Sequence, residues 1–241
     1  MILHSITKTF LVVSALLFAS VAISSEEVDR GFHEFERGLH FKQRGDDVSA
    51  VRWWRLAAFL GNADAQYNIG LMYDEGRGVS QNHVSAVRWW RAAAEQGVAE
   101  AQNELGVKYD QGRGVPQDDA EAMRWYRLAA EQGHAYAQYN LGLMYGEGRG
   151  VVPRNSAEAV RWYRMAAEQG NSMAQHNLGA MYANGTGVHW DDVLAHKWLN
   201  LAAAQGQETA ADNRDMVAAR MTSAQIADAQ KLAREWSARQ R

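Results

Sequence analysis

Apolar residues recur along this chain with the spacing of paired amphipathic helices. In residues 64–97, one stripe runs through Ala65, Ile69 and Met72, which share a face of a helix because they lie four and three residues apart. A second stripe of the same kind follows between residues 86 and 93, after a glycine-containing turn. This pattern predicts two antiparallel α-helices joined by a short loop.

The same pattern returns at a regular interval. Ala65, Ala101, Ala137 and Ala174 are 36, 36 and 37 residues apart, and each copy carries a Gly-x-Gly-Val turn and an Ala-Ala pair before a glycine. A period of this length is typical of a solenoid, in which each unit buries its apolar face against its neighbours. The second helix of each unit is expected to begin at a good N-cap residue, namely Asn82, Asp118 or Asn155.

Glycines stand at two places in every unit. One is inside the first helix, at Gly70, Gly106, Gly142 and Gly179, where glycine costs roughly 1 kcal/mol relative to alanine. Its recurrence predicts that another backbone packs closely there. The Gly-x-Gly-Val segments match no phosphate-loop pattern and follow no predicted strand, so we interpret them as tight turns that use positive φ.

Two segments carry a resemblance to a known family. Residues 140–151 (Asn-Leu-Gly-Leu-Met-Tyr-Gly-Glu-Gly-Arg-Gly-Val) and residues 159–170 (Ala-Val-Arg-Trp-Tyr-Arg-Met-Ala-Ala-Glu-Gln-Gly) resemble the Sel1-like repeat family, a relative of the tetratricopeptide repeat with a longer loop. The resemblance implies an all-α, right-handed α/α superhelical solenoid. Residues 63–207 hold four such repeats, between a divergent tetratricopeptide-like unit at 25–62 and capping helices at 208–241.

Both ends of the repeat array depart from the pattern, as a solenoid needs in order to close its core against water. The unit before residue 63 lacks the Gly-x-Gly loop, and we expect stability to be lowest near residues 32–45. Thr222 is expected to cap a last helix, whose apolar stripe consists of Ile226, Ala229, Leu232, Ala233 and Trp236.

The first residues resemble a secretory signal peptide, predicted over residues 1–24. Lys8 precedes a short apolar run, and small residues allow cleavage after Ala22 or Ser24. The alternative is an uncleaved anchor, but the run is short for a membrane-spanning helix. Together with the absence of cysteine, this indicates an exported bacterial protein, periplasmic or secreted, with no stable membrane span after cleavage.

Composition excludes several kinds of chemistry. A net charge of −3 does not favour nucleic-acid binding, and the lack of cysteine removes thiolate catalysis and cysteine metal sites. The nearest approach to a metal cluster is His189, Asp191, Asp192 and His196, which lacks the spacing of a zinc site. No catalytic motif stands out, so we predict no enzymatic activity, no metal and no cofactor.

A basic residue precedes a tryptophan in every unit. These pairs are Arg52-Trp53, Arg88-Trp89, Arg124-Trp125, Arg161-Trp162 and Lys197-Trp198. Interleaved arginine and aromatic residues can stack nucleic-acid bases. We favour instead a packing seam between repeats, in which cationic groups lie over the rings.

The resemblance also implies where a partner binds. In tetratricopeptide relatives, particular first-helix positions line the inner surface of the solenoid. Residues at these positions that differ between repeats are the candidate partner-binding residues: Tyr67, Tyr136, Tyr139, His176, Asp64, Asp74, Glu75, Glu100 and Asp110. The tyrosines are expected to act as anchors and the acids to contact basic side chains.

We therefore predict a scaffold, adaptor or regulator that binds a protein or peptide partner in the cell envelope. Three alternatives remain open on the residues alone. The inner surface could be merely solvated, it could bind glycan or peptidoglycan through exposed aromatic rings, or the chain could be a cell-wall-related hydrolase. The hydrolase reading is weakened because the family members linked to hydrolysis are rich in cysteine and this chain has none.

Overall fold

The computed structural model describes residues 24–240, and within them every regular element is an α-helix. The described part of the chain divides into two compact units, residues 24–81 and 82–240. The signal-peptide prediction falls almost entirely outside the described residues. None of the helices in residues 24–240 combines the length and the hydropathy that crossing a membrane requires.

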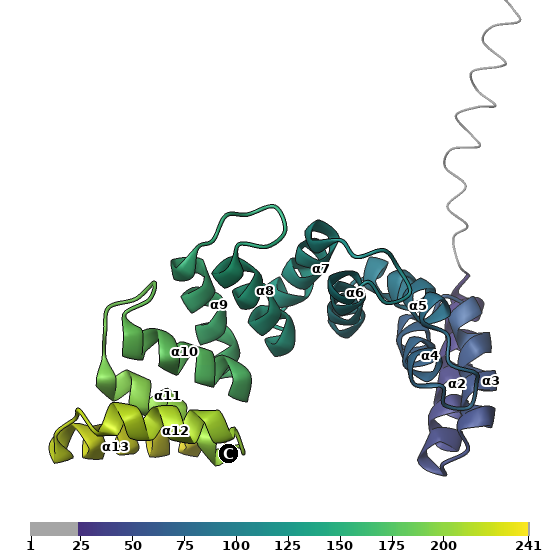
Figure 1. Ribbon diagram of the computed structural model, residues 1–241. Coiled ribbons are helices and arrows are strands. Elements are labelled where there is room, and N and C mark those ends of the chain that lie inside the picture. The colour runs from purple at the N-terminus through teal and green to yellow at the C-terminus, as the bar shows by residue number, and fades with distance from the viewer. Residues whose placement is uncertain (1–23, 241) are drawn as a thin grey trace, which may run out of the picture. The chain divides into compact units, whose positions relative to one another are not determined.

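The first unit contains α2, α3 and α4, and the second unit contains the remaining nine described helices. Their bounds are α2 (Ser25–Gln43), α3 (Asp47–Phe59), α4 (Ala63–Glu75), α5 (His83–Glu95), α6 (Ala99–Gln111), α7 (Asp119–Glu131), α8 (Ala135–Glu147), α9 (Ser156–Glu168), α10 (Ser172–Asn184), α11 (Asp192–Ala204), α12 (Glu208–Ala218) and α13 (Ser223–Arg239). In the second unit, α6 pairs with α7, α8 with α9 and α10 with α11 (Figure 1). The prediction of an all-α helical repeat solenoid is confirmed.

Each second helix begins where the sequence predicted. The side chains of Asn82, Asp118 and Asn155 accept hydrogen bonds from the first free backbone N–H groups of α5, α7 and α9. The buried residues of α5 are Ala86, Val87, Trp90, Ala93 and Ala94, which include the expected stripe. Local capping therefore sets where these helices begin, and the apolar periodicity sets which face of each is buried.

The glycines inside α6, α8 and α10 each face an aromatic or aliphatic side chain of the paired second helix. A Cβ at Gly106 would lie 2.6 Å from the Tyr126 ring, and one at Gly142 would lie 2.7 Å from the Tyr163 ring. The same relation holds in the first unit, where Gly38 faces Trp54. The predicted close approach at these glycines is confirmed. The prediction that another backbone lies there is wrong, because the glycine makes room for a large side chain.

The Gly-x-Gly turn connects each repeat to the one before it. Gly112 ends α6 with φ +65°, a left-handed conformation that favours glycine. Gly114 has φ +79°, and a Cβ there would come within 2.5 Å of the His83 carbonyl oxygen at the start of α5. The second glycine is therefore required by contact with the preceding repeat as well as by its backbone angle.

Buried glutamines join consecutive repeats. Gln138, with only 1 % of its surface exposed, donates from Nε2 to the Ala130 carbonyl oxygen of α7 at 3.1 Å. Its Oε1 accepts a hydrogen bond of 2.8 Å from Gln169, the C-cap of α9. The same two bonds recur around Gln102 and Gln175. Each glutamine thus satisfies a buried carbonyl group and fixes the next helix pair against it.

Three of the predicted basic-tryptophan pairs stack as expected, with the cationic group over the ring, but within one helix. Arg124 lies 4.0 Å from the centroid of the Trp125 ring, and Lys197 lies 3.7 Å from that of Trp198. In both pairs the ring belongs to the next residue of the same helix. These stacks stabilise single helices. Between repeats, Arg91 lies over the Tyr109 ring and Arg164 over the Tyr182 ring, so cation–ring contacts join consecutive repeats beside the glutamines.

The C-terminal end closes by a different arrangement. On α12, Asp215 occupies the register position at which the earlier first helices carry glycine, so the close approach of a paired helix is lost. Instead α13 packs against α11, and Trp236 donates from Nε1 to Glu168 at 2.9 Å (Figure 1). The predicted cap by Thr222 is confirmed, and the stripe residues Ala229, Ala233 and Trp236 are buried.

We predict opposite effects for two glycine substitutions on α8. Gly142→Ala should lower the free energy of unfolding by about 1–3 kcal/mol, because the new methyl group overlaps the Tyr163 ring. Gly146→Ala should raise it by up to about 1 kcal/mol, because the nearest atom is Ala159 Cβ at 3.6 Å and alanine favours helix. Urea unfolding followed by circular dichroism measures both, and equal effects would contradict the packing described.

Candidate functional site

The first helices of the second unit, α6, α8, α10 and α12, share one face that we call the first-helix face. A ladder of hydrogen bonds runs along it from repeat to repeat. Asn140 donates from Nδ2 to Asn103 Oδ1 at 3.3 Å, and Asn177 on the next first helix bonds to the Tyr139 hydroxyl. In both cases an asparagine holds the residue one register position earlier in the preceding repeat.

The ladder ends at His176. Its Nε2 lies 2.9 Å from Nδ2 of Asn213 on α12, and burial lowers the pKa of His176 below its ordinary value. The neutral ring can therefore accept the amide hydrogen bond. Candidate residues Tyr139 and His176 are thus both held in place by the following repeat.

A groove of about 280 Å³ opens on this face between α8 and α10. Tyr163 from α9 contributes to it together with the apolar side chains Leu143 and Met181. Polar groups come from Glu147, Arg154, Asn177 and Asn184. The groove therefore combines an apolar base with amide and charged groups at its sides, the composition typical of a site for a peptide segment.

Tyr139 extends the aromatic part of the groove. Its ring centroid lies 5.9 Å from that of Tyr163. Burial is the main cause that raises the pKa of both tyrosines, so both remain neutral hydroxyl groups at physiological pH. Since Gly142 admits the Tyr163 ring, the packing contact of the repeat also places the aromatic base of the groove.

The other exposed candidate tyrosine lies at a separate hollow. Tyr136 is 58 % exposed and lines a cavity of about 200 Å³ with Met173, Gln169 and Gln205. The structure therefore brings Tyr136 and Met173 together, as the first-helix positions implied. It places Tyr139 and His176 along the ladder.

The candidate acids differ in whether they are available. Asp110 accepts from Arg149 of the following turn at 2.6 Å, and Arg149 also binds Glu147 at 2.9 Å. Glu100 is exposed and makes no ion pair among residues 24–240. Asp110 is therefore occupied within the chain, and its expected contact with a basic partner competes with Arg149.

Four candidates lie in the first unit. Asp64 is exposed on α4, and Tyr67 is half-buried three residues later. Glu75 pairs with Arg77 at 3.3 Å, and the Asp74 carbonyl oxygen accepts a bond of 2.7 Å from Gln81. Asp64 differs from Glu75 in making no ion pair among the described residues.

The residues considered for a metal serve separate structural roles. Asp191 caps α11, and Asp192 is bound by Arg220, whose Nη2 lies 2.6 Å from the carboxylate. His189 is exposed in the turn, whereas His196 is buried on α11. No group of three or more potential metal ligands occurs in residues 24–240.

The asparagine and glutamine ladders were not foreseen. The signal was present, because Asn140, Asn177 and Asn213 are 37 and 36 residues apart and the buried glutamines recur with nearly the same interval. Polar residues at the repeat period predict contact between repeats as well as apolar ones do. The expectations above used only apolar stripes and positions that vary between repeats, and these asparagines and glutamines belong to neither set.

Known proteins share these repeats. The Sel1 repeat family model matches residues 31–62, 63–98, 99–134, 135–171 and 172–207. A solved structure of c5321, a protective antigen present in uropathogenic Escherichia coli strains displaying an SLR fold, is 34 % identical with a TM-score of 0.76, covering 87 % of this chain and 45 % of that one. The Sel1 repeat protein from Oxalobacter formigenes is 35 % identical with a TM-score of 0.70, covering 78 % and 76 %.

This chain therefore spans less than half the length of the Escherichia coli antigen. No curated protein matches this chain.

Acid should weaken the second unit through His134, the N-cap of α8. Its Nδ1 accepts a hydrogen bond from the Ala137 N–H at 3.2 Å, which requires a neutral ring, and burial lowers the pKa of His134 although Glu100 opposes the shift. A histidine with a lowered folded pKa contributes stability that is present above its ordinary value of 6.5 and is lost as the pH falls through the folded pKa.

His134→Asn should remove part of this pH dependence, because Asn171 caps α10 in the same way without titrating. Between pH 7 and pH 5, the wild-type chain should lose on the order of 1 kcal/mol more stability than the variant. Urea unfolding at the two pH values measures the difference. His176 and His196 are present in both proteins, so identical pH dependence would show that the cap does not titrate.

Proposed function

The chain belongs to the Sel1 repeat family, and we propose that it is an exported scaffold or adaptor whose first-helix face binds a segment of another envelope protein. The Sel1 repeat fold is typically a protein-interaction scaffold. Its relatives are generally without enzymatic activity, and we assign binding without catalysis to this chain as well.

The groove between α8 and α10 is the observation that carries the proposal. Tyr139, Tyr163, Leu143 and Met181 supply apolar and aromatic area, which contributes much of the energy in protein interfaces. Asn177 is already oriented by its bond to Tyr139. A binding surface fixed by internal hydrogen bonds loses little conformational entropy when a partner binds.

The partner segment is expected to insert an apolar side chain into the groove and to present polar backbone groups to the surrounding amides. Amides both donate and accept, so they can pair with either backbone group of a peptide. The exposed carboxylate of Glu100, in the same unit as the groove, favours basic residues in the partner. Asp110 is less suited to this role because of its bond to Arg149.

Capture of a partner from intact cells tests this proposal. A tagged chain is crosslinked in place and compared with the double variant Tyr136→Ala/Tyr139→Ala, which removes both candidate aromatic anchors of the second unit. Recovery of a specific protein should fall by about tenfold or more, because two partly buried aromatic contacts are lost. Val84→Ser, at a 49 % exposed position on the second helix α5 and so away from the first-helix face, serves as the matched control and should leave recovery unchanged.

Two outcomes would contradict the proposal. One is recovery of the same protein at equal yield with all three chains. The other is co-sedimentation of the purified chain with cell-wall sacculi, sensitive to the double variant, when no protein is captured. The second outcome would indicate that the first-helix face binds a glycan.

Export is tested at the N-terminus. We expect chains purified from the periplasm or the medium to begin at Ile23 or Ser25, since cleavage is predicted after Ala22 or Ser24. Intact-mass measurement distinguishes these products. A chain that keeps residues 1–22 and stays in the membrane fraction would support the anchor instead.

A further inference from the structure

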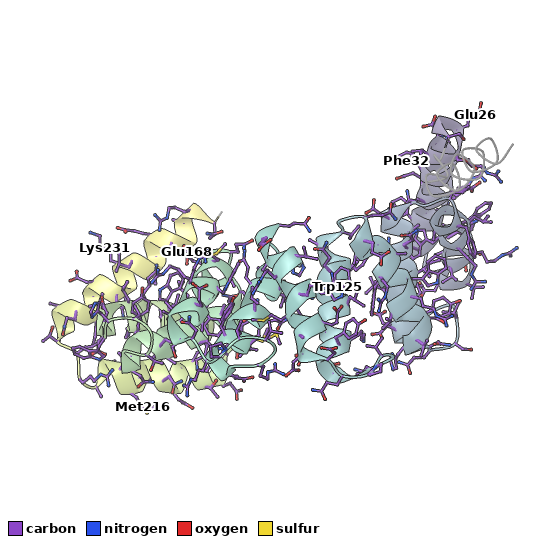
Figure 2. The ribbon with its side chains drawn as sticks, turned by 90° about the horizontal axis from the view of Figure 1, so that it is seen from above. Glu26, Phe32, Trp125, Glu168, Met216 and Lys231 are labelled. Carbon is purple, nitrogen blue, oxygen red and sulfur yellow. The ribbon has the colours of Figure 1, made fainter. Side chains whose placement is uncertain are left out.

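Helix α2 carries an apolar stripe whose N-terminal half is exposed. Val28, Phe32, Phe35 and Leu39 follow one another at intervals of four, three and four residues, which places them on one face. Val28 is 55 % exposed and Phe32 is 54 % exposed, while Phe35 and Leu39 are half-buried. Phe32 projects from α2 in Figure 2.

The opposite side of α2 is the one that packs. Gly38 faces the Trp54 ring of α3, and Gly31 lies next to Leu60 after α3. On the repeat register set by Gly38, Phe32 and Phe35 occupy the first-helix positions that Asp64 and Tyr67 occupy on α4. The stripe therefore lies on the face of α2 and α4 that is equivalent, in the first unit, to the first-helix face of the second unit. It is not part of the core between α2 and α3.

Acidic side chains border this stripe. Asp29 and Glu36 directly follow stripe residues, are exposed, and make no ion pair among residues 24–240. In contrast, Arg37 pairs with Glu34 at 3.2 Å and Lys42 pairs with Asp47 at 2.9 Å. Arg30 is exposed as well, but it lies two residues from both Val28 and Phe32 and therefore on the opposite side of α2 from the stripe. The charge that borders the stripe is consequently negative.

We propose that the α2 stripe docks an amphipathic helix with basic flanks from a partner protein. The proposal rests on the scaffold function above and names the class of partner segment. Valine, phenylalanine and leucine side chains offer no hydrogen-bond partners, so an extended peptide lying on them would leave its backbone groups unsatisfied. A helix satisfies its own backbone, and its apolar ridge fits a stripe of the same spacing.

The stripe sets the size and charge of the docked helix. Residues 28–39 span about 16 Å of helix, or three turns, so three or four apolar residues of the partner can be buried. Lysine or arginine residues beside the partner's apolar ridge would lie against Asp29 and Glu36. Since both carboxylates are exposed, these contacts add selectivity and salt dependence more than affinity.

Fluorescence anisotropy with a designed probe tests the proposal. The probe is a fluorescein-labelled 16-residue helical peptide with leucines on one face and lysines on its flanks. One control peptide has the same composition in an order without a stripe, and another carries glutamate in place of lysine. The purified chain should bind the first peptide, and should bind either control at least about tenfold more weakly.

Variants then locate the binding. Phe32→Ser should weaken binding of the lysine peptide by about tenfold or more. Glu36→Lys should weaken binding of the lysine peptide and strengthen binding of the glutamate peptide. Met216→Ser, at a 65 % exposed apolar position in the second unit, is the matched control and should change neither. Thermal unfolding of each variant verifies that the fold is retained, as expected for exposed positions.

Equal binding of the ordered and reordered peptides, or equal binding by wild type and Phe32→Ser, overturns the proposal. Self-association of the chain that disappears in Phe32→Ser also overturns it, because a second copy would then occupy the stripe. Failure here is separable from failure of the proposed scaffold function. The peptide assay reports on α2 in the first unit, whereas the tyrosine double variant reports on the groove in the second.

Discussion

The contact between a helix glycine and a large side chain of the paired helix is the constraint on which the repeat depends. At Gly142 it allows α9 to approach α8 so closely that the Tyr163 ring fills the space of a side chain. The same contact presents Tyr163 to the groove, where Tyr139 packs on it. A residue pair chosen for packing therefore also forms the aromatic base of the candidate binding site.

Polar contacts then determine how one helix pair meets the next. Buried glutamines such as Gln138 bridge the end of one second helix to the end of the following one. On the first-helix face, asparagines bridge successive first helices through Asn103 and Tyr139. Because unpaired amides are costly inside a protein, these ladders fix the register between repeats more sharply than apolar packing alone.

The ends of the array show how the same register can be used differently. At α12 the glycine position holds Asp215, and α13 covers α11 instead of pairing with α12. At α2 the glycine is kept as Gly38, but aromatic residues Phe32 and Phe35 stand where later repeats carry more polar side chains. Divergence at one end thus closes the core, and divergence at the other end concentrates apolar surface.

The sequence by itself determined the helix pairs, their N-caps, the repeat period and the family, because capping and apolar periodicity act within a few residues. It also indicated that Gly142 and its equivalents mark a close approach. The tertiary structure decided three contacts: the ring of Tyr163 against Gly142, the ion pair between Asp110 and Arg149, and the bond from Asn177 to Tyr139. Each of these joins residues about 20 to 40 positions apart, and such pairs are chosen by the distance between repeats, which local preference does not encode.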